Sequence, residues 1–182
     1  FSVAHPTLSN DENRLYFASD MEGTYGQSDL WYVNILEDHT YGIPVNLGAT
    51  INTEERETFP FISNKNNLYF SSDGHVGLGG LDVFVTNLND DGSVSGNVTN
   101  LGQPTNGTSD DFGFIINEEN GLGFVSSNRS GDNGSVDDEI YLINEKCTIT
   151  VEGIVTDIDT GVLIPGAVVS LMDDLNKLVD SA

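Results

Sequence analysis

The sequence predicts an all-β protein, and three observations support that prediction. Short segments that alternate apolar and polar residues recur along the 182-residue chain, bounded by turns rich in Asn, Asp and Gly. The same arrangement returns three times, at intervals of 53 and 55 residues. No segment has the 3.6-residue apolar periodicity of an amphipathic helix. A small β-sheet unit that repeats along the chain explains all three observations.

The repeat is clearest over residues 58–88, TFPFISNKNNLYFSSDGHVGLGGLDVFVTNL, and related stretches begin at His5 and Phe112. Each has a first apolar run, a turn, a second run ending in Ser-Asp or Ser-Asn, a Gly-bearing loop and a third run that opens with an acid. Three alignments define the register: Leu15-Tyr16-Phe17 with Leu68-Tyr69-Phe70 and Leu122-Gly123-Phe124; Ser19-Asp20 with Ser72-Asp73 and Ser127-Asn128; and Asp29-Leu30-Trp31 with Asp82-Val83-Phe84 and Glu139-Ile140-Tyr141.

Four short strands are expected in each of the first two repeats and three in the third. The expected strands are 2–8, 15–19, 29–36 and 45–48, then 58–63, 68–72, 82–88 and 98–101, then 112–116, 122–126 and 139–144. Four short antiparallel strands in a repeat of this length are typical of a β-propeller blade. Closed propellers usually hold 4–8 blades, so three repeats predict part of a larger propeller, with further blades before Phe1.

The pattern changes near Cys147, which divides the chain into two predicted domains. The propeller repeats occupy residues 1–146, as units of about 1–53, 54–107 and 108–146. Residues 147–182 alternate at Ile149 and Val151 and turn at residues 159–161, as in the first strands of an antiparallel sandwich. An immunoglobulin-like sandwich needs about 100 residues. The second domain is therefore expected to be a truncated Ig-like β-sandwich.

The charge balance excludes several classes of partner. The chain carries 29 acidic and 6 basic residues, a net charge of −23. Such a surface repels phosphate backbones and anionic lipids, which excludes nucleic-acid binding. No apolar run approaches the roughly 18 residues of a membrane-spanning helix. Cationic protein patches and divalent cations are the natural partners, although the acidity can equally serve solubility alone.

No pattern in the sequence indicates catalysis. His5, His39 and His75 lack the spacing of a zinc site, and no GxSxG nucleophile elbow occurs. Cys147 has no local basic partner that would lower its pKa and activate it. The sequence therefore predicts a protein that is not an enzyme and needs no cofactor.

The repeated acids allow two interpretations. Asp20 and Asp73 end one predicted strand, and Asp29 and Asp82 begin the next, so they are expected to hold the intervening loop through backbone N–H groups. The alternative is calcium, which takes 6–8 oxygen ligands on a flexible loop. The loop at 130–139 is the candidate, and its potential ligands are Asp132, Asp137, Asp138 and Glu139.

Two of these patterns resemble known families. HPTLSNDENRLYFASD and FPFISNKNNLYFSSDGHVGLGGLDVF resemble the TolB-type, WD-like propeller repeats of bacterial envelope proteins, over about residues 1–144. The third repeat departs from them, with Gly113 in place of the Pro and Asn128 in place of the Asp. VEGIVTDIDTGVLIPGAVVSL resembles the opening of a carboxypeptidase-regulatory-like domain.

This domain order resembles OmpA-family lipoproteins of the Bacteroidetes envelope, such as the PorE-like component of type IX secretion. The resemblance implies a periplasmic, outer-membrane-associated scaffold that binds envelope or secretion-system proteins. It also implies that peptidoglycan is bound only by a domain outside these residues. The alternatives are a secreted propeller enzyme that acts on glycans or peptides, with its active site elsewhere, and a surface adhesin stalk.

Overall fold

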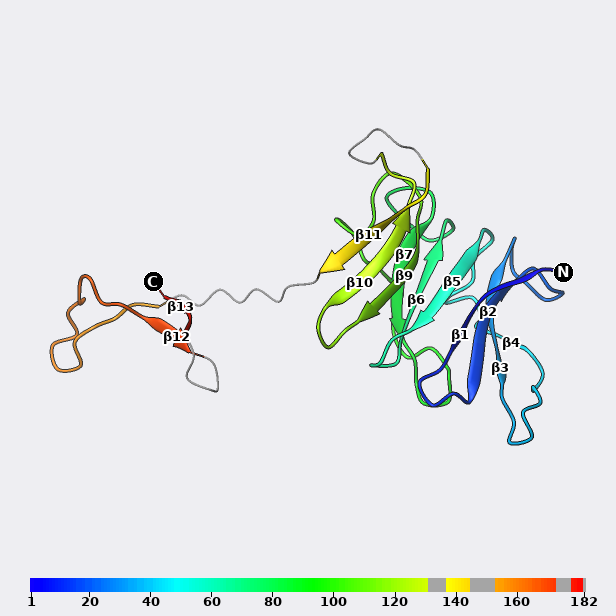
Figure 1. The fold of residues 1–182 in the computed structure, drawn as a ribbon, viewed down its shortest axis with the longest axis horizontal. Coiled ribbons are helices and arrows are strands. Elements are labelled where there is room, and N and C mark those ends of the chain that lie inside the picture. Colours follow the sequence, from blue (N-terminus) through cyan, green and yellow to red (C-terminus); the bar gives the residue numbers. More distant parts are fainter. Residues whose placement is uncertain (131–136, 145–152, 173–177, 182) are drawn as a thin grey trace. The chain divides into compact units, whose positions relative to one another are not determined.

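A computed structural model describes residues 1–130, 137–144, 153–172 and 178–181 (Figure 1). The chain falls into two units, Phe1–Lys146 and Cys147–Ala182. Within the described residues every regular element is a β-strand and there is no helix. The prediction of an all-β protein is confirmed. Since no described segment is a helix, none could cross a membrane as one.

The first unit contains three antiparallel sheets whose strands follow one another in chain order. Sheet 1 consists of β1 (Val3–Leu8), β2 (Arg14–Ser19), β3 (Asp29–Asn34) and β4 (Val45–Asn46). Sheet 2 consists of β5 (Glu57–Ile62), β6 (Asn67–Ser72), β7 (Asp82–Asn87) and β8 (Thr99–Asn100). Sheet 3 consists of β9 (Asp111–Asn117), β10 (Leu122–Ser127) and β11 (Glu139–Asn144). All eleven predicted strands of this unit are present, with ends within two residues of those expected.

Figure 1 shows the three sheets side by side in chain order. One apolar cluster fills the space between sheets 1 and 2 and includes Tyr16, Leu30, Phe70 and Phe84. A second cluster fills the space between sheets 2 and 3; its buried members are Tyr69, Val83, Phe114, Ile116 and Val125. Burial of each such large side chain stabilises the fold by about 1.5–3 kcal/mol. Aromatic residues therefore pack between the sheets.

The register of sheet 3 corrects one alignment made from the sequence. Phe17 pairs with Trp31 and Phe70 with Phe84, whereas the residue that pairs with Tyr141 is Val125. Gly123-Phe124-Val125, and not Leu122-Gly123-Phe124, therefore corresponds to Leu68-Tyr69-Phe70. The similarity of the letters was misleading, because Ser127 follows Phe124 by three residues but Ser72 follows Phe70 by only two. Phe124 thus occupies the position of Tyr16 and Tyr69.

The first strand of every sheet has a bulge at the same place. One extra residue lies between Ala4 and Thr7, between Thr58 and Phe61, and opposite the Phe124–Ser126 segment of β10. Within the bulge His5, Phe59 and Gly113 have positive φ angles of 54°, 50° and 63°. Gly113 therefore occupies the bulge position that His5 and Phe59 hold in the first two sheets. The prediction that it occupies the position of the proline is wrong. Phe114 occupies the proline position.

In the second unit, β12 (Ser170–Met172) pairs with β13 (Leu178–Ser181), and Thr156 forms an isolated bridge with Leu163. The turn expected at residues 159–161 is present. Its Thr160 donates from both its backbone N–H and its hydroxyl to the carboxylate of Asp157. Ile149 and Val151 lie outside the described residues, and the Ig-like sandwich remains a prediction.

Candidate functional site: the junctions between sheets

Four buried carboxylates stand at the starts of strands, and each accepts a hydrogen bond from the backbone N–H four residues earlier. In sheet 1 the Tyr25 N–H donates to Asp29 at 2.9 Å, and in sheet 2 the Leu78 N–H donates to Asp82. Both aspartates are fully buried. Each also accepts from an asparagine side chain of the last strand of its sheet, Asn46 or Asn100. The prediction that these acids hold the loop is confirmed.

The acids that end the second strands hold the start of a first strand instead. Asp20 accepts a hydrogen bond from the backbone N–H of Ser2. Asp73 accepts one from the backbone N–H of Arg56 at 2.8 Å and two from the Arg56 guanidinium, at 2.7 and 2.9 Å. These two aspartates therefore fix the approach to β1 and β5.

An asparagine in each connector clamps the sheet that precedes it. The side chain of Asn52 accepts from the Leu30 N–H at 2.8 Å and donates to the Leu30 carbonyl at 3.0 Å. Asn106 makes the same pair of hydrogen bonds to Val83, both at 2.8 Å. Both asparagines are buried and also donate to the asparagine of the last strand. The connector between two sheets is thereby tied to the middle of the earlier sheet.

The clamp was missed from the sequence, although a signal was present. Asn46, Gly48 and Asn52 recur as Asn100, Gly102 and Asn106, each 54 residues later.

The other two buried carboxylates are Glu57 and Asp111, at the start of β5 and β9. Glu57 accepts from the Thr53 N–H and hydroxyl, both at 2.7 Å, and from the Ser72 hydroxyl at 2.6 Å. Burial raises the pKa of Glu57 above its usual value. Asp111 accepts from the Gly107 N–H at 2.6 Å and pairs with the Arg129 guanidinium.

Two of the three histidines, His5 and His75, pack between sheets. His5 Nδ1 lies 2.7 Å from the Thr58 hydroxyl, and its ring stacks on Phe59 with centroids 3.7 Å apart. Burial lowers the pKa of His5. His75 donates from Nε2 to the Ile51 carbonyl at 2.7 Å, beside Phe70 and Phe84. His39 lies in the turn between β3 and β4.

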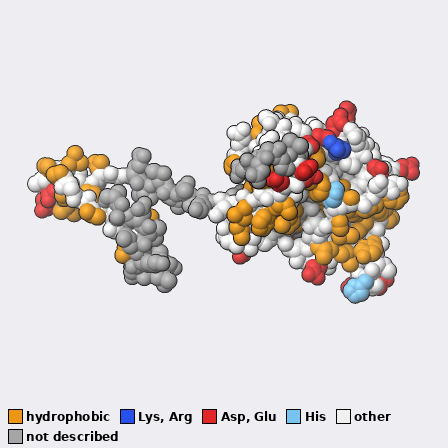
Figure 2. All heavy atoms as spheres, turned by 45° about the horizontal axis from the view of Figure 1, so that its top comes forward, with side chains coloured by type: hydrophobic (Ala, Val, Ile, Leu, Met, Phe, Trp, Pro, Cys, Tyr) orange, Lys and Arg blue, Asp and Glu red, His pale blue; other side chains and the backbone are white. Residues whose placement is uncertain are grey.

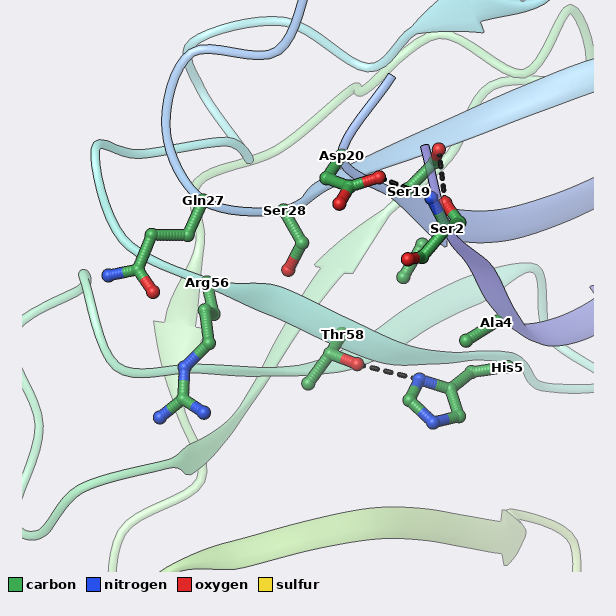
Figure 3. Close-up of a pocket in the computed structure, with 10 residues that line it drawn as sticks. Ser2, Ala4, His5, Ser19, Asp20, Gln27, Ser28, Arg56 and Thr58 are labelled. Atoms are coloured by element: carbon green, nitrogen blue, oxygen red, sulfur yellow. Dashed lines mark hydrogen bonds between the residues drawn. The ribbon is translucent and has the colours of Figure 1, made fainter.

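A cavity of about 260 Å³ opens between sheets 1 and 2 (Figure 3). Figure 3 shows His5 and Thr58 on one side and Gln27 and Arg56 on the other, with Asp20 above them. This cavity could not be predicted from the sequence, because its walls come from segments far apart in the chain.

The predicted calcium loop is only partly described. Asp132 lies outside the described residues, whereas Asp137, Asp138 and Glu139 lie at the start of β11. Glu139 accepts from the Tyr141 hydroxyl at 3.2 Å. In the described segments no three His, Cys, Asp or Glu side chains form a group that could hold a metal ion. Calcium binding remains a prediction that calorimetry of the metal-stripped protein at millimolar Ca²⁺ would test.

Comparison with known proteins assigns no family. A scan against protein-family models finds no match, and a search of curated proteins finds none.

Proposed function

We propose that the chain is a non-catalytic protein-interaction scaffold of the bacterial cell envelope. In this proposal the three sheets are blades of a TolB-type propeller, and residues 147–182 begin a carboxypeptidase-regulatory-like domain. The wider assignment to an OmpA-family, outer-membrane-associated periplasmic protein linked to type IX secretion rests on the sequence resemblance.

The observation that supports a scaffold is the use made of the buried polar side chains. Asp29, Asp82, Glu57 and Asp111 hold loops and strand starts through repeated hydrogen bonds. Asn52 and Asn106 clamp the connectors in the same way. These hydrogen bonds hold the loops and connectors in fixed positions. Loops held in this way lose little conformational entropy when a partner binds.

The charge indicates the chemistry of the partner. With a net charge of −23, the protein attracts a surface rich in Lys and Arg and speeds encounter with it at low salt. Figure 2 shows Asp and Glu side chains on the face in view, between patches of hydrophobic side chains.

In-cell crosslinking followed by mass spectrometry of peptides from residues 1–144 tests the proposal. We expect crosslinks to outer-membrane or secretion-system proteins. We also expect that Asp137→Lys with Asp138→Lys weakens capture of that partner. Charge reversal at Asp90 and Asp91, in the β7–β8 turn, is the matched control. Turnover of cell-wall glycans or peptides by the purified protein, without such crosslinks, would contradict the proposal.

A further inference from the structure

The residue that follows the second strand has the same structural role in all three sheets. Its side-chain oxygen accepts a hydrogen bond from the backbone N–H that immediately precedes the first strand. The donor and acceptor are Ser2 and Asp20 in sheet 1, Arg56 and Asp73 in sheet 2, and Asp110 and Asn128 in sheet 3. Because the amide of Asn128 fills this role as well as a carboxylate does, the role requires an oxygen and not a negative charge.

The negative charge at this position is neutralised in sheet 2 but not in sheet 1. In sheet 2 the Arg56 guanidinium donates to Asp73 at 2.7 and 2.9 Å. In sheet 1 Ser2 holds the position of Arg56 and carries no charge. Among the described residues Asp20 forms no ion pair, and its second carboxylate oxygen accepts no hydrogen bond. The charge of Asp20 is therefore neither required by the fold nor neutralised by it.

Asp20 lies in the wall of the cavity between sheets 1 and 2, where His5 and Arg56 are the other titratable groups (Figure 3). The Arg56 guanidinium is already paired with Asp73. Burial lowers the pKa of His5, so its ring is neutral at pH 7. The unpaired charge in the described wall of this cavity is therefore negative, and the cavity attracts a cation.

The hydrogen-bonding groups of the wall also favour a ligand that donates. The Gln27 amide nitrogen donates to the Glu55 carboxylate at 2.5 Å, and the Ser28 hydroxyl donates to the Glu57 carbonyl at 3.2 Å. Within the part of the chain that the structure describes, the Gln27 side-chain oxygen and the second oxygen of Asp20 accept no hydrogen bond. Ammonium and guanidinium groups carry several N–H donors and accept none.

The equivalent positions at the second junction are apolar. Phe59 holds the position of His5, and Phe112 holds that of Thr58. The rings of Phe59 and Phe112 pack with their centroids 5.1 Å apart. At the first junction a hydrogen bond of 2.7 Å between His5 and Thr58 takes the place of this contact, beside a cavity of about 260 Å³. The polar wall is thus a departure from the repeat, at the junction where Asp20 is unpaired.

We propose that this cavity binds a basic side chain, Lys or Arg, of the protein partner. The cation pairs with Asp20 as the Arg56 guanidinium pairs with Asp73. The aliphatic part of the basic side chain lies against Ala4 and Ala18, which also line the cavity. The inference rests on the proposed scaffold function and names the type of residue that the partner inserts. A side chain that fills a cavity at an interface is a typical binding hot spot.

An NMR titration of the 182-residue chain with Nα-acetyl-lysine N-methylamide, and with its arginine counterpart, tests the site. We expect saturable shifts at millimolar concentration in the amide signals of Ala4, Ala18 and Gln27. The affinity should fall as salt is added, because salt screens the charges. The lysine probe acetylated at its side-chain nitrogen is uncharged and should not bind. No saturable shift with either charged probe, or equal binding of the acetylated probe, would overturn the proposal.

Asp20→Asn removes the charge and keeps the oxygen that accepts from Ser2, as Asn128 does in sheet 3. It should weaken binding of the charged probe about threefold or more. Asp38→Asn, in the exposed turn after β3, makes the same change in net charge and is the control. It should bind as the unaltered chain does. Equal weakening in both variants would reduce the effect to the overall charge and overturn the proposal. Circular dichroism confirms that each variant is folded.

Ser2→Arg supplies in sheet 1 the cation that Arg56 supplies in sheet 2. The new guanidinium should pair with Asp20 and prevent binding of the charged probes. Binding at the strength of the unaltered chain would contradict the placement of the cation at Asp20.

In-cell crosslinking of the variants separates this inference from the scaffold proposal. We expect Asp20→Asn to lower the yield of crosslinks to the partner and Asp38→Asn to leave it unchanged. Crosslinks that persist at full yield in Asp20→Asn would overturn the basic anchor alone and leave the scaffold in place. A protein that forms no crosslinks even when unaltered would contradict the scaffold, whereas the probe titration still decides whether the cavity binds a cation.

Discussion

The two junctions between sheets bury a carboxylate at the same position but neutralise it differently. Glu57 pairs across the sheet with Ser72, as Asp111 does with Ser127. Glu57 is surrounded by uncharged donors from Thr53 and Ser72. Asp111 instead faces the guanidinium of Arg129. The fold therefore requires an acceptor at this position, and the sequence around it decides whether the charge has a counterion.

Arg129 does more at the second junction than neutralise a charge. Its guanidinium also donates to the carbonyls of Pro104 and Thr105, and its Nε donates to the Ser127 hydroxyl at 2.9 Å. It lies over the Tyr141 ring, 5.0 Å from the centroid. One side chain thus ties the connector, β10 and β11 together.

The largest effect is expected from Arg129→Met. The substitution leaves the fully buried Asp111 without its cation, and loss of one partner of a buried pair typically destabilises by about 3–5 kcal/mol. Arg56→Met is the matched control. Its ion pair with Asp73 is exposed, with half of the Arg56 side chain open to solvent, and is worth about 1 kcal/mol or less. Urea unfolding measures the free energy of unfolding of both variants. Equal decreases for Arg129→Met and Arg56→Met would show that the buried ion pair stabilises the protein no more than the exposed one.

A smaller and equal loss is expected at the two asparagine clamps. Asn52→Ala and Asn106→Ala each leave the backbone N–H of Leu30 or Val83 buried without its partner, whereas the carbonyl of the same residue still accepts from the N–H of Leu47 or Leu101. We expect each to lower the free energy of unfolding by about 1–3 kcal/mol. Asn89→Ala, at an exposed turn residue, is the control and should change it by less than about 0.5 kcal/mol. A clear difference between Asn52→Ala and Asn106→Ala would show that the two clamps are not equivalent.

The smallest effect concerns pH and is confined to the first junction. Because burial raises the pKa of Glu57 in the folded state, the protonated form favours folding. Its contribution is complete below the unfolded-state value near 4.5 and is lost as the pH rises through the folded-state value. Glu57→Gln should remove this pH-dependent decrease in the free energy of unfolding.

Denaturant unfolding of both proteins at a series of pH values measures the effect. The unfolding free energy of the unaltered chain, minus that of Glu57→Gln, should fall as the pH rises from about 4. A difference that stays constant or rises with pH would show that the carboxylate is stabilised in its charged form.

Much of the fold could be predicted from the sequence, because strand alternation and turn residues act locally. The eleven strands of the first unit and the loop-holding role of Asp29 and Asp82 are examples. The alignment of Phe124 was off by one residue, since register depends on cross-strand pairs and not on similar letters. The role of Arg129 could not be predicted, because its partners Pro104, Thr105 and Asp111 meet it only after two sheets have packed.

Amide hydrogen exchange at Leu30 and Val83 tests most directly the claim that both junctions use one clamp. Each N–H is buried and donates to the asparagine of the following connector, so both should exchange among the slowest amides of the first unit. Asn52→Ala should speed exchange at Leu30 far more than at Val83, and Asn106→Ala should do the reverse. Fast exchange at either amide in the unaltered chain would contradict the account.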